Sequence, residues 1–174
     1  MKKIIIAIDS FKGCLTSAEA GKAAEKGIKS INPSCHTSVI PIADGGEGLL
    51  DVLITATKGK YITLSAHGPL MKMAKTHYGL SGNGRTAIIE MAAISGLPLV
   101  PIEQRNPMLT TTFGTGELIK DALNKGCRNF IIGIGGSATN DAGLGMLQAL
   151  GFRFLDKSGH TLGTGGQIME AVAN

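Results

Sequence analysis

A short, continuous apolar run at residues 4–8 predicts a first strand, and residues 37–42 predict a second. Such a run is typical of a strand that is buried on both faces of a parallel sheet. Each predicted strand is followed by a helical pattern: Thr16 and Glu19 have capping-box spacing at the start of the first, and residues 49–56 form the second. Because strand, loop and helix alternate, the sequence predicts an α/β unit with its loops at the carboxyl ends of the strands.

The pattern changes in the middle of the chain. Short, partly alternating apolar runs at residues 61–65, 74–80 and 85–90 are separated by turns rich in Gly, Pro, Ser and Asn. These runs predict a small antiparallel or mixed set of strands. We therefore expect two lobes, with residues 1–65 in the first and residues 66–174 in the second.

A Pro-rich linker leads into a further α/β pattern. A periodic helix ends near Leu123, residues 129–134 predict another buried strand, and a second helix reaches Leu150. Residues 152–155 are a candidate for a last strand. The tail, residues 165–174, begins a helical pattern and then stops, so we expect a truncated chain.

Composition narrows the class of protein. Hydrophobic residues make up 43% of the chain and charged residues 17%, as in globular proteins. The net charge is +4, but the basic residues form no long run. Trp is absent and aromatic residues make up only 4% of the chain. Both observations argue against nucleic-acid binding. Three Cys without paired spacing indicate a reducing, cytoplasmic setting, and no apolar run is long enough to span a membrane.

Candidate chemistry lies in four Gly-rich polar turns, each of which follows a strand or opens a helix: residues 9–13, 44–48, 110–117 and 135–141. Backbone N–H groups in such turns can bind anions. Together the turns hold carboxylates, hydroxyls and one lysine. Phosphoryl transfer uses this mixture, because amides and Lys neutralise phosphate oxygens while acids hold Mg²⁺ or a substrate hydroxyl.

The first two turns have a structural interpretation beside the functional one. Residues 9–13 could be a helix-capping loop with a solvated lysine, and Glu47 could lie in a first helical turn, where an acid is favourable. In the functional interpretation, Asp44 and Glu47 flank a Gly-Gly pair and could both face a closely bound ligand. The candidate site residues of these turns are Asp9, Ser10, Lys12, Asp44, Gly45, Gly46 and Glu47.

The last two turns also leave alternatives open. Thr115 could simply cap a helix, although three threonines and two glycines exceed what a cap requires. The fourth turn matches a dinucleotide fingerprint, with Gly133, Gly135 and Ala138 followed by Asp156, which keeps an NAD(P)-binding oxidoreductase module open. The candidate site residues are Thr112, Gly114, Thr115, Gly116, Gly135, Gly136, Ser137, Thr139, Asn140 and Asp141.

Several short blocks in a fixed order carry a family resemblance. They are residues 9–13, 43–48, 68–70, 90–92, 96–97, 106–107, 111–119, 133–141, 145–146 and 149–151. With these blocks the chain resembles the bacterial type-I glycerate kinase family. The resemblance implies ATP-dependent phosphorylation of D-glycerate, usually to 2-phosphoglycerate, with Mg²⁺ and in the cytoplasm. It also implies a Rossmann-like parallel-sheet lobe, an inserted second α/β lobe and a site in the cleft between them.

Members of this family have roughly twice the present length, a size typical of two full domains. The resemblance therefore implies that the chain corresponds to about the N-terminal half of a member, with both lobes incomplete. Apolar surface would then be exposed where the rest docks, which favours a homo-oligomer or poor solubility. A kinase fragment without activity of its own is an alternative.

The residues and the resemblance together suggest roles. Lys12 would neutralise charge on the transferring phosphoryl group, and Asp44 or Glu47 would hold Mg²⁺ or the glycerate hydroxyl. Asp141 is a second candidate for the acid that accepts the hydroxyl proton. The last two turns would bind phosphate or the glycerate carboxylate through amides and hydroxyls. The expected ligands are thus ATP, Mg²⁺ and D-glycerate, with no nucleic acid and no membrane.

Overall fold

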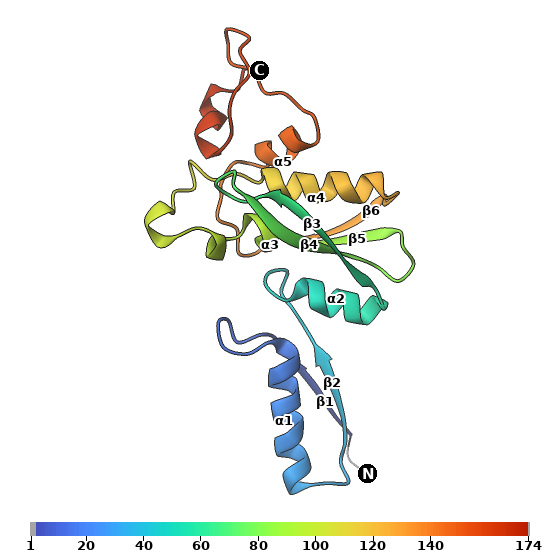
Figure 1. Cartoon of the computed structure of the whole chain (residues 1–174). Helices are drawn as coiled ribbons and strands as arrows, with labels where there is room; N and C mark the ends of the chain where they lie inside the picture. Colours follow the sequence, from blue (N-terminus) through green and yellow to red (C-terminus); the bar gives the residue numbers. More distant parts are fainter. Residues whose placement is uncertain (1–2, 174) are drawn as a thin grey trace.

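A computed structural model describes residues 3–173, which form two sheets with helices around them (Figure 1). The first sheet has two parallel strands, β1 (Lys3–Ile8) and β2 (His36–Pro41), which pair along their whole length. Helix α1 (Ser17–Ile31) connects the two strands and packs against both. The predicted β–α–β unit is confirmed.

The capping box predicted at the start of α1 is present. The Thr16 hydroxyl accepts a hydrogen bond from the Glu19 backbone N–H (3.2 Å), and the Glu19 carboxylate accepts one from the Thr16 N–H (2.9 Å). These bonds satisfy two of the donors that the start of a helix leaves open. The helix ends at Ile31, just before Pro33, whose ring cannot continue it.

The second sheet has four strands in the order β3-β4-β5-β6. They are β3 (Lys60–His67), β4 (Met73–Leu80), β5 (Thr86–Glu90) and β6 (Asn129–Gly133). The first three are antiparallel neighbours, which agrees with the antiparallel or mixed set predicted for residues 61–90, and β6 joins them parallel to β5, so the whole sheet is mixed. A parallel pair needs a crossover, which here passes through α3 (Ala92–Ser95) and α4 (Phe113–Asn124).

Helices cover both faces of this sheet. On one face, Leu50 and Ile54 of α2 (Leu49–Thr57) pack against the buried Ile88 of β5. On the other face, α4 packs on a core that contains Ile89. Neighbouring residues of a strand point to opposite faces, so β5 belongs to both cores. Figure 1 shows α2 between the β1–β2 unit and the four-stranded sheet, which brings the turn before α2 close to both.

Short helices complete the described chain: η1 (Leu97–Leu99), η2 (Ile102–Gln104), α5 (Leu144–Ala149) and η3 (Gly166–Ala171). Helix α5 packs on α4. The helical pattern of the tail is realised as the 3₁₀ helix η3. Within residues 3–173, none of the helices has both the length and the apolar character that crossing a membrane would require.

One strand prediction is wrong. Residues 152–155 do not form a strand, and only Leu155 makes an isolated bridge, to Thr161. The physical reason is local, because the Asp156 carboxylate accepts two backbone N–H groups from the residues that follow it (2.8 and 2.9 Å). These bonds close a tight turn where a strand would have to continue.

Two strands predicted to be buried on both faces are exposed, β1 on one face and β6 partly on both. In β1, Ile6 is buried but Ile5 is 60% exposed, and in β6 both Ile131 and Ile132 are more than a third exposed. An apolar run predicts that a strand is buried, but it does not show which element packs on each face. Both strands lie at the edge of a sheet, where fewer elements surround them. The α/β class is confirmed. The lobe division at residue 65, which falls inside β3, stays a prediction, as does the incompleteness of the lobes.

Candidate functional site

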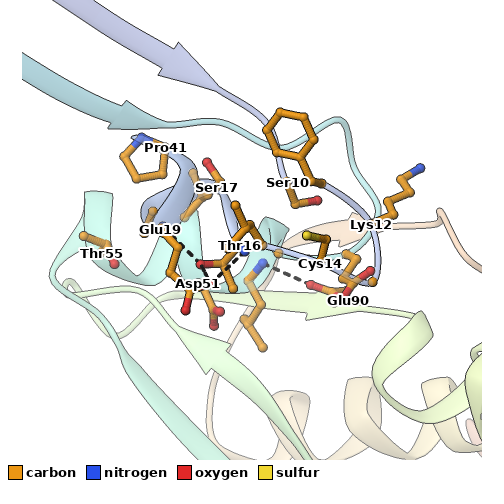
Figure 2. A pocket seen from close by; sticks show the side chains of 18 of the residues that line it. Ser10, Lys12, Cys14, Thr16, Ser17, Glu19, Pro41, Asp51, Thr55 and Glu90 are labelled. Carbon is orange, nitrogen blue, oxygen red and sulfur yellow. Dashed lines mark hydrogen bonds between the residues drawn. The ribbon is translucent and has the colours of Figure 1, made fainter. Parts of the chain in front are cut away.

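A cleft of about 470 Å³ lies between the first turn, the start of α2 and the end of β5 (Figure 2). The first turn contributes Ser10 and Lys12 to its wall, the second turn contributes Glu47, α2 contributes Asp51 and β5 contributes Glu90. The first two predicted turns are thus brought together. Hydroxyl, ammonium and carboxylate groups gather in this opening, which makes it the candidate site.

One buried serine fixes the first turn at the mouth of the cleft. The Ser17 hydroxyl donates to the Ile8 carbonyl (2.5 Å) and accepts from the Ile42 N–H (3.0 Å). It therefore joins the carboxyl ends of β1 and β2 to the start of α1, and the chain between Ile8 and Ser17 must loop outward. Sequence reasoning assigned Ser17 no role, although the capping signal at Thr16 marks its position.

Lys12 lies at the rim of the cleft, where Figure 2 shows its extended side chain. It is exposed and makes no hydrogen bond or ion pair with any residue that the structure describes. An unpaired ammonium at this place is available to an anionic ligand. Behind it, the Asp9 carboxylate accepts the Ser10 N–H (2.7 Å) and so supports the turn. Ser10 lines the cleft, whereas Asp9 does not.

The two acids of the second turn differ in position. Glu47 lines the cleft, whereas Asp44 lies outside the lining, is exposed, and accepts a hydrogen bond from the Gly46 N–H (3.2 Å). Gly45 and Gly48 have φ angles of 97° and 88°, in the left-handed region that other residues rarely adopt. The glycines therefore shape the turn that carries both acids.

Glu90 is a further cleft residue to which sequence reasoning gave no role. It is half-buried, and its Oε2 accepts the Leu50 N–H (3.3 Å). Burial raises the pKa of Glu90, repulsion from Asp51 and Glu47 adds to the rise, and the N–H groups of Leu50 and Gly48 oppose it. An acid at the carboxyl end of an apolar strand was the signal that could have found it.

The acids of the second turn also bear on the predicted Mg²⁺ site. Within residues 3–173, no group of three or more His, Cys, Asp or Glu could hold a metal ion. Mg²⁺ in phosphoryl-transfer sites uses one or two carboxylates and completes its shell with phosphate oxygens and water. The exposed carboxylates of Asp44 and Glu47 fit this smaller demand, and the assignment to them stays a prediction.

The third and fourth turns meet at a buried carboxylate. Asp141 is 1% exposed and accepts the N–H groups of Thr112 (2.8 Å), Gly143 (3.0 Å) and Gly145 (3.2 Å). It also accepts the hydroxyls of Thr111 (3.2 Å) and Thr112 (2.9 Å). The donors at the starts of α4 and α5 are therefore satisfied by the protein's own anion. This geometry favours a positioning role for Asp141 over the proton-accepting role suggested above.

The other predicted residues of the third turn pack between elements. The Thr115 hydroxyl is bonded to that of Ser95 (2.9 Å), and both side chains are buried. A Cβ on Gly114 would collide with the backbone of His67 in β3, and one on Gly116 would collide with the backbone of α5. These glycines allow α4 to lie close to its neighbours, which accounts for them without a ligand. Their ligand role stays a prediction.

The fourth turn touches the second. The Gly135 N–H donates to the Gly45 carbonyl (3.1 Å), and a Cβ on Gly135 would lie 2.6 Å from the Cα of Gly46. The second turn is therefore the structural link between the cleft and the rest of the predicted site.

Side chains of the fourth turn are used mainly within the protein. The Ser137 hydroxyl donates to the Thr139 carbonyl (3.1 Å), and the Thr139 hydroxyl donates to the Thr110 carbonyl (2.8 Å). Gly136 and Asn140 are exposed. None of these four predicted residues lines the cleft, and their part in ligand binding stays a prediction.

The structure does not build the dinucleotide alternative. Strand β6 ends at Gly133, but α5 begins only at Leu144, so the helix does not follow the strand directly as the fingerprint requires. Asp156 lies in the turn described above instead of ending a sheet strand. A Cβ on Gly133 would collide with the side chain of Leu49, which shows that this glycine accommodates α2.

Comparisons with known proteins agree with one another. The model of the glycerate kinase family matches residues 4–174. A glycerate kinase of Bacillus subtilis (strain 168) is 54% identical over 172 residues, and a glycerate 2-kinase of Escherichia coli (strain K12) is 51% identical over 170 residues. The alignments cover 99% and 98% of this chain but 45% of each relative, so the chain spans about half the length of the curated relatives it matches.

A solved structure is also similar over the whole chain. A crystal structure described as a candidate glycerate kinase 2 from Salmonella typhimurium LT2 superposes with a TM-score of 0.84 at 48% identity. The match covers 100% of this chain and 47% of that one. The arrangement of sheets and turns described above is therefore shared with that protein over the matched half.

Proposed function

The chain belongs to the glycerate kinase family, and we propose that it takes part in transferring the γ-phosphoryl group of ATP to D-glycerate, with 2-phosphoglycerate as product. The reaction uses Mg²⁺ and takes place in the cytoplasm, with no nucleic acid or membrane as partner. The relatives that carry this function in their names are about twice as long, so the chain supplies part of the machinery.

The observation that carries this function is the unpaired ammonium of Lys12 beside a cleft lined by acids. Catalysis of phosphoryl transfer depends on positioning the reactants and stabilising negative charge. Lys12 provides positive charge against the phosphoryl oxygens. Mg²⁺ held by Glu47 or Asp44 together with phosphate oxygens would supply further positive charge.

The glycerate hydroxyl gives up its proton as its oxygen attacks phosphorus and the bond to the ADP oxygen breaks. An acid that accepts this proton has to reach the cleft. Glu47 lines the cleft and Asp44 lies in the same turn, so both remain candidates. Asp141 is surrounded by its own donors and instead shapes the starts of α4 and α5.

The test measures ADP release by a full-length family member that contains this chain, called here the intact protein, with Mg·ATP and with or without D-glycerate, and identifies the product by ³¹P NMR. Glycerate-dependent release with 2-phosphoglycerate is expected, and its absence contradicts the proposal. The 174-residue chain is assayed in parallel. If only the intact protein turns over, the chain is a part without activity of its own. Size-exclusion chromatography of the same samples tests for a homo-oligomer.

Lys12→Ala in the intact protein tests the residue that carries the argument. We expect kcat to fall about 100-fold, as when one preorganised charge-stabilising group is removed. The melting temperature should not change, because Lys12 makes no contact that folding needs. Lys26→Ala, at an exposed lysine of α1, is the matched control and should keep full turnover. Near-normal turnover in Lys12→Ala would remove Lys12 from the mechanism.

A further inference from the structure

We propose that Glu90 is a positioning residue of the cleft, whose carboxylate holds the 45–48 turn and the start of α2 so that Glu47 is presented to the substrates. The inference rests on the proposed function and adds to it a residue from a different sheet strand. The argument uses the hydrogen bonds on both sides of the turn and the position of Glu90 in the cleft wall.

Helix α2 begins without a cap of its own. Gly48, the residue before the helix, has no side chain and a left-handed φ, so it offers no acceptor to the first N–H groups. Glu90 supplies one from β5, since its Oε2 accepts the Leu50 N–H, and the Gly48 N–H also favours its charged form. A negative charge at this place also complements the positive end of the helix.

The other end of the turn is held by the fourth turn, which follows β6. Glu90 pairs with Gly133 in the β5–β6 ladder, and two residues further along the Gly135 N–H donates to the Gly45 carbonyl (3.1 Å). The 45–48 turn is therefore anchored by Gly135 at one end and by Glu90 at the other. Glu47 lies between these anchors, so its place in the cleft depends on both.

A carboxylate is an expensive choice for capping alone. Glu90 is half-buried, and burial together with Asp51 and Glu47 disfavours its charged form. A neutral side chain with an oxygen acceptor would satisfy the same N–H groups without this cost. The anchoring therefore requires an oxygen acceptor at this place, which Glu90→Gln keeps, and does not require the charge.

The experiment compares Glu90→Ala and Glu90→Gln in the intact protein. We expect Glu90→Ala to lower kcat/KM for D-glycerate by roughly tenfold to a hundredfold, because displacement of reacting groups costs about that much. Glu90→Gln should recover most of the loss, since its amide oxygen can still accept the Leu50 N–H. Hydrogen exchange of the Leu50 amide should be faster in Glu90→Ala and near normal in Glu90→Gln.

Asp121→Ala is the matched control. Asp121 also accepts a hydrogen bond from another element, that of the Tyr78 hydroxyl in β4 (2.8 Å), but it lies outside the cleft and outside the four turns. This variant should lose stability while keeping kcat/KM. An equal loss of kcat/KM in Asp121→Ala would show a general effect of stability and would overturn the proposal.

Two further outcomes also overturn it. Unchanged kcat/KM in Glu90→Ala shows that the position of the turn does not matter, and equal losses in both Glu90 variants show that charge, not the hydrogen bond, acts. An intact wild-type protein that does not phosphorylate glycerate contradicts the proposed function instead. The Leu50 exchange rate then decides about Glu90 alone: faster exchange in Glu90→Ala supports the anchoring, and unchanged exchange overturns it.

Discussion

Two regions of this molecule place a carboxylate against backbone N–H groups at the start of a helix, with different results. At the Asp141 junction, where the third and fourth turns meet, the carboxylate is enclosed and all its surroundings are donors. At the cleft, Glu90 holds α2 but borders open space, with the unpaired Lys12 on the rim. The difference is burial. A Gly-rich polar turn is available to a ligand where the fold leaves its charges or donors unpaired.

The largest effect is expected from Asp141→Ala. This substitution leaves the buried N–H groups of Thr112 and Gly145 without an acceptor, so we expect a loss of about 3 kcal/mol or more in the free energy of unfolding. Urea denaturation measures it. Asp156→Ala, which removes a carboxylate that accepts N–H groups in an exposed turn, should have a much smaller effect. If Asp141→Ala keeps full stability but loses turnover, Asp141 acts on a ligand and not in holding the helix starts.

Gly135→Ala tests the contact between the two regions. The new Cβ would press on the Gly46 backbone at 2.6 Å, where no flexible side chain can yield. We expect a destabilisation of about 1–3 kcal/mol by overpacking, together with reduced turnover because the second turn moves. Gly163→Ala is the control, since a Cβ there meets nothing within 4 Å and its φ is unstrained. Equal stability of the two variants would mean that the turns are not coupled.

Thr16→Ala sharpens the comparison by removing a cap that is local in sequence. Loss of the Thr16 hydroxyl should cost about 1 kcal/mol of stability, the usual value for an N-cap. Thr16 also lines the cleft, but its N–H and hydroxyl are bonded to Glu19 within the capping box, so we expect the KM for D-glycerate to change little. Thermal unfolding and steady-state kinetics on the same variant measure both quantities. A raised KM would show that the cap also supports the cleft.

The smallest effect concerns the pH dependence of that capping box. Hydrogen bonds from Thr16 hold the pKa of Glu19 below its ordinary value of 4.5. The ionised carboxylate therefore stabilises the fold above pH 4.5, and this contribution is lost as the pH falls through the lowered pKa. The difference in melting temperature between wild type and Glu19→Gln should be present at neutral pH and should shrink in acid. Calorimetry that finds a constant difference would contradict this assignment.

Much of the fold could be predicted because its signals are local. Apolar runs marked β1 and β6, the strand expected at residues 37–42 corresponds to β2, and the Thr16–Glu19 spacing marked the start of α1. The failure at residues 152–155 is also local, since the turn closed by Asp156 competes with a strand. An apolar run does not show whether another element packs on each face of the strand. Ile5 was therefore expected to be buried, but it is exposed.

The candidate site was predicted only in part. Lys12 and Glu47 were selected from their turns, and the fold brings both to one cleft. Asp141 had the same sequence signals, yet it bonds Thr112, 29 residues away, and is buried. Glu90 is hydrogen-bonded to Leu50, which is 40 residues away in the sequence. Contacts over such a separation produce no periodic pattern from which they could be predicted.

The sequence by itself determined every strand except the one wrongly expected at residues 152–155, together with the cap of α1, the Gly-shaped turns and the family, because these depend on neighbouring residues and on short blocks in a fixed order. Only the tertiary structure decided which polar turn opens on a cleft and which is closed by a carboxylate. That decision depends on burial and on pairing between distant segments: a donor enclosed with an acceptor is satisfied within the protein, whereas the charge of Lys12 at an open rim is left for a ligand.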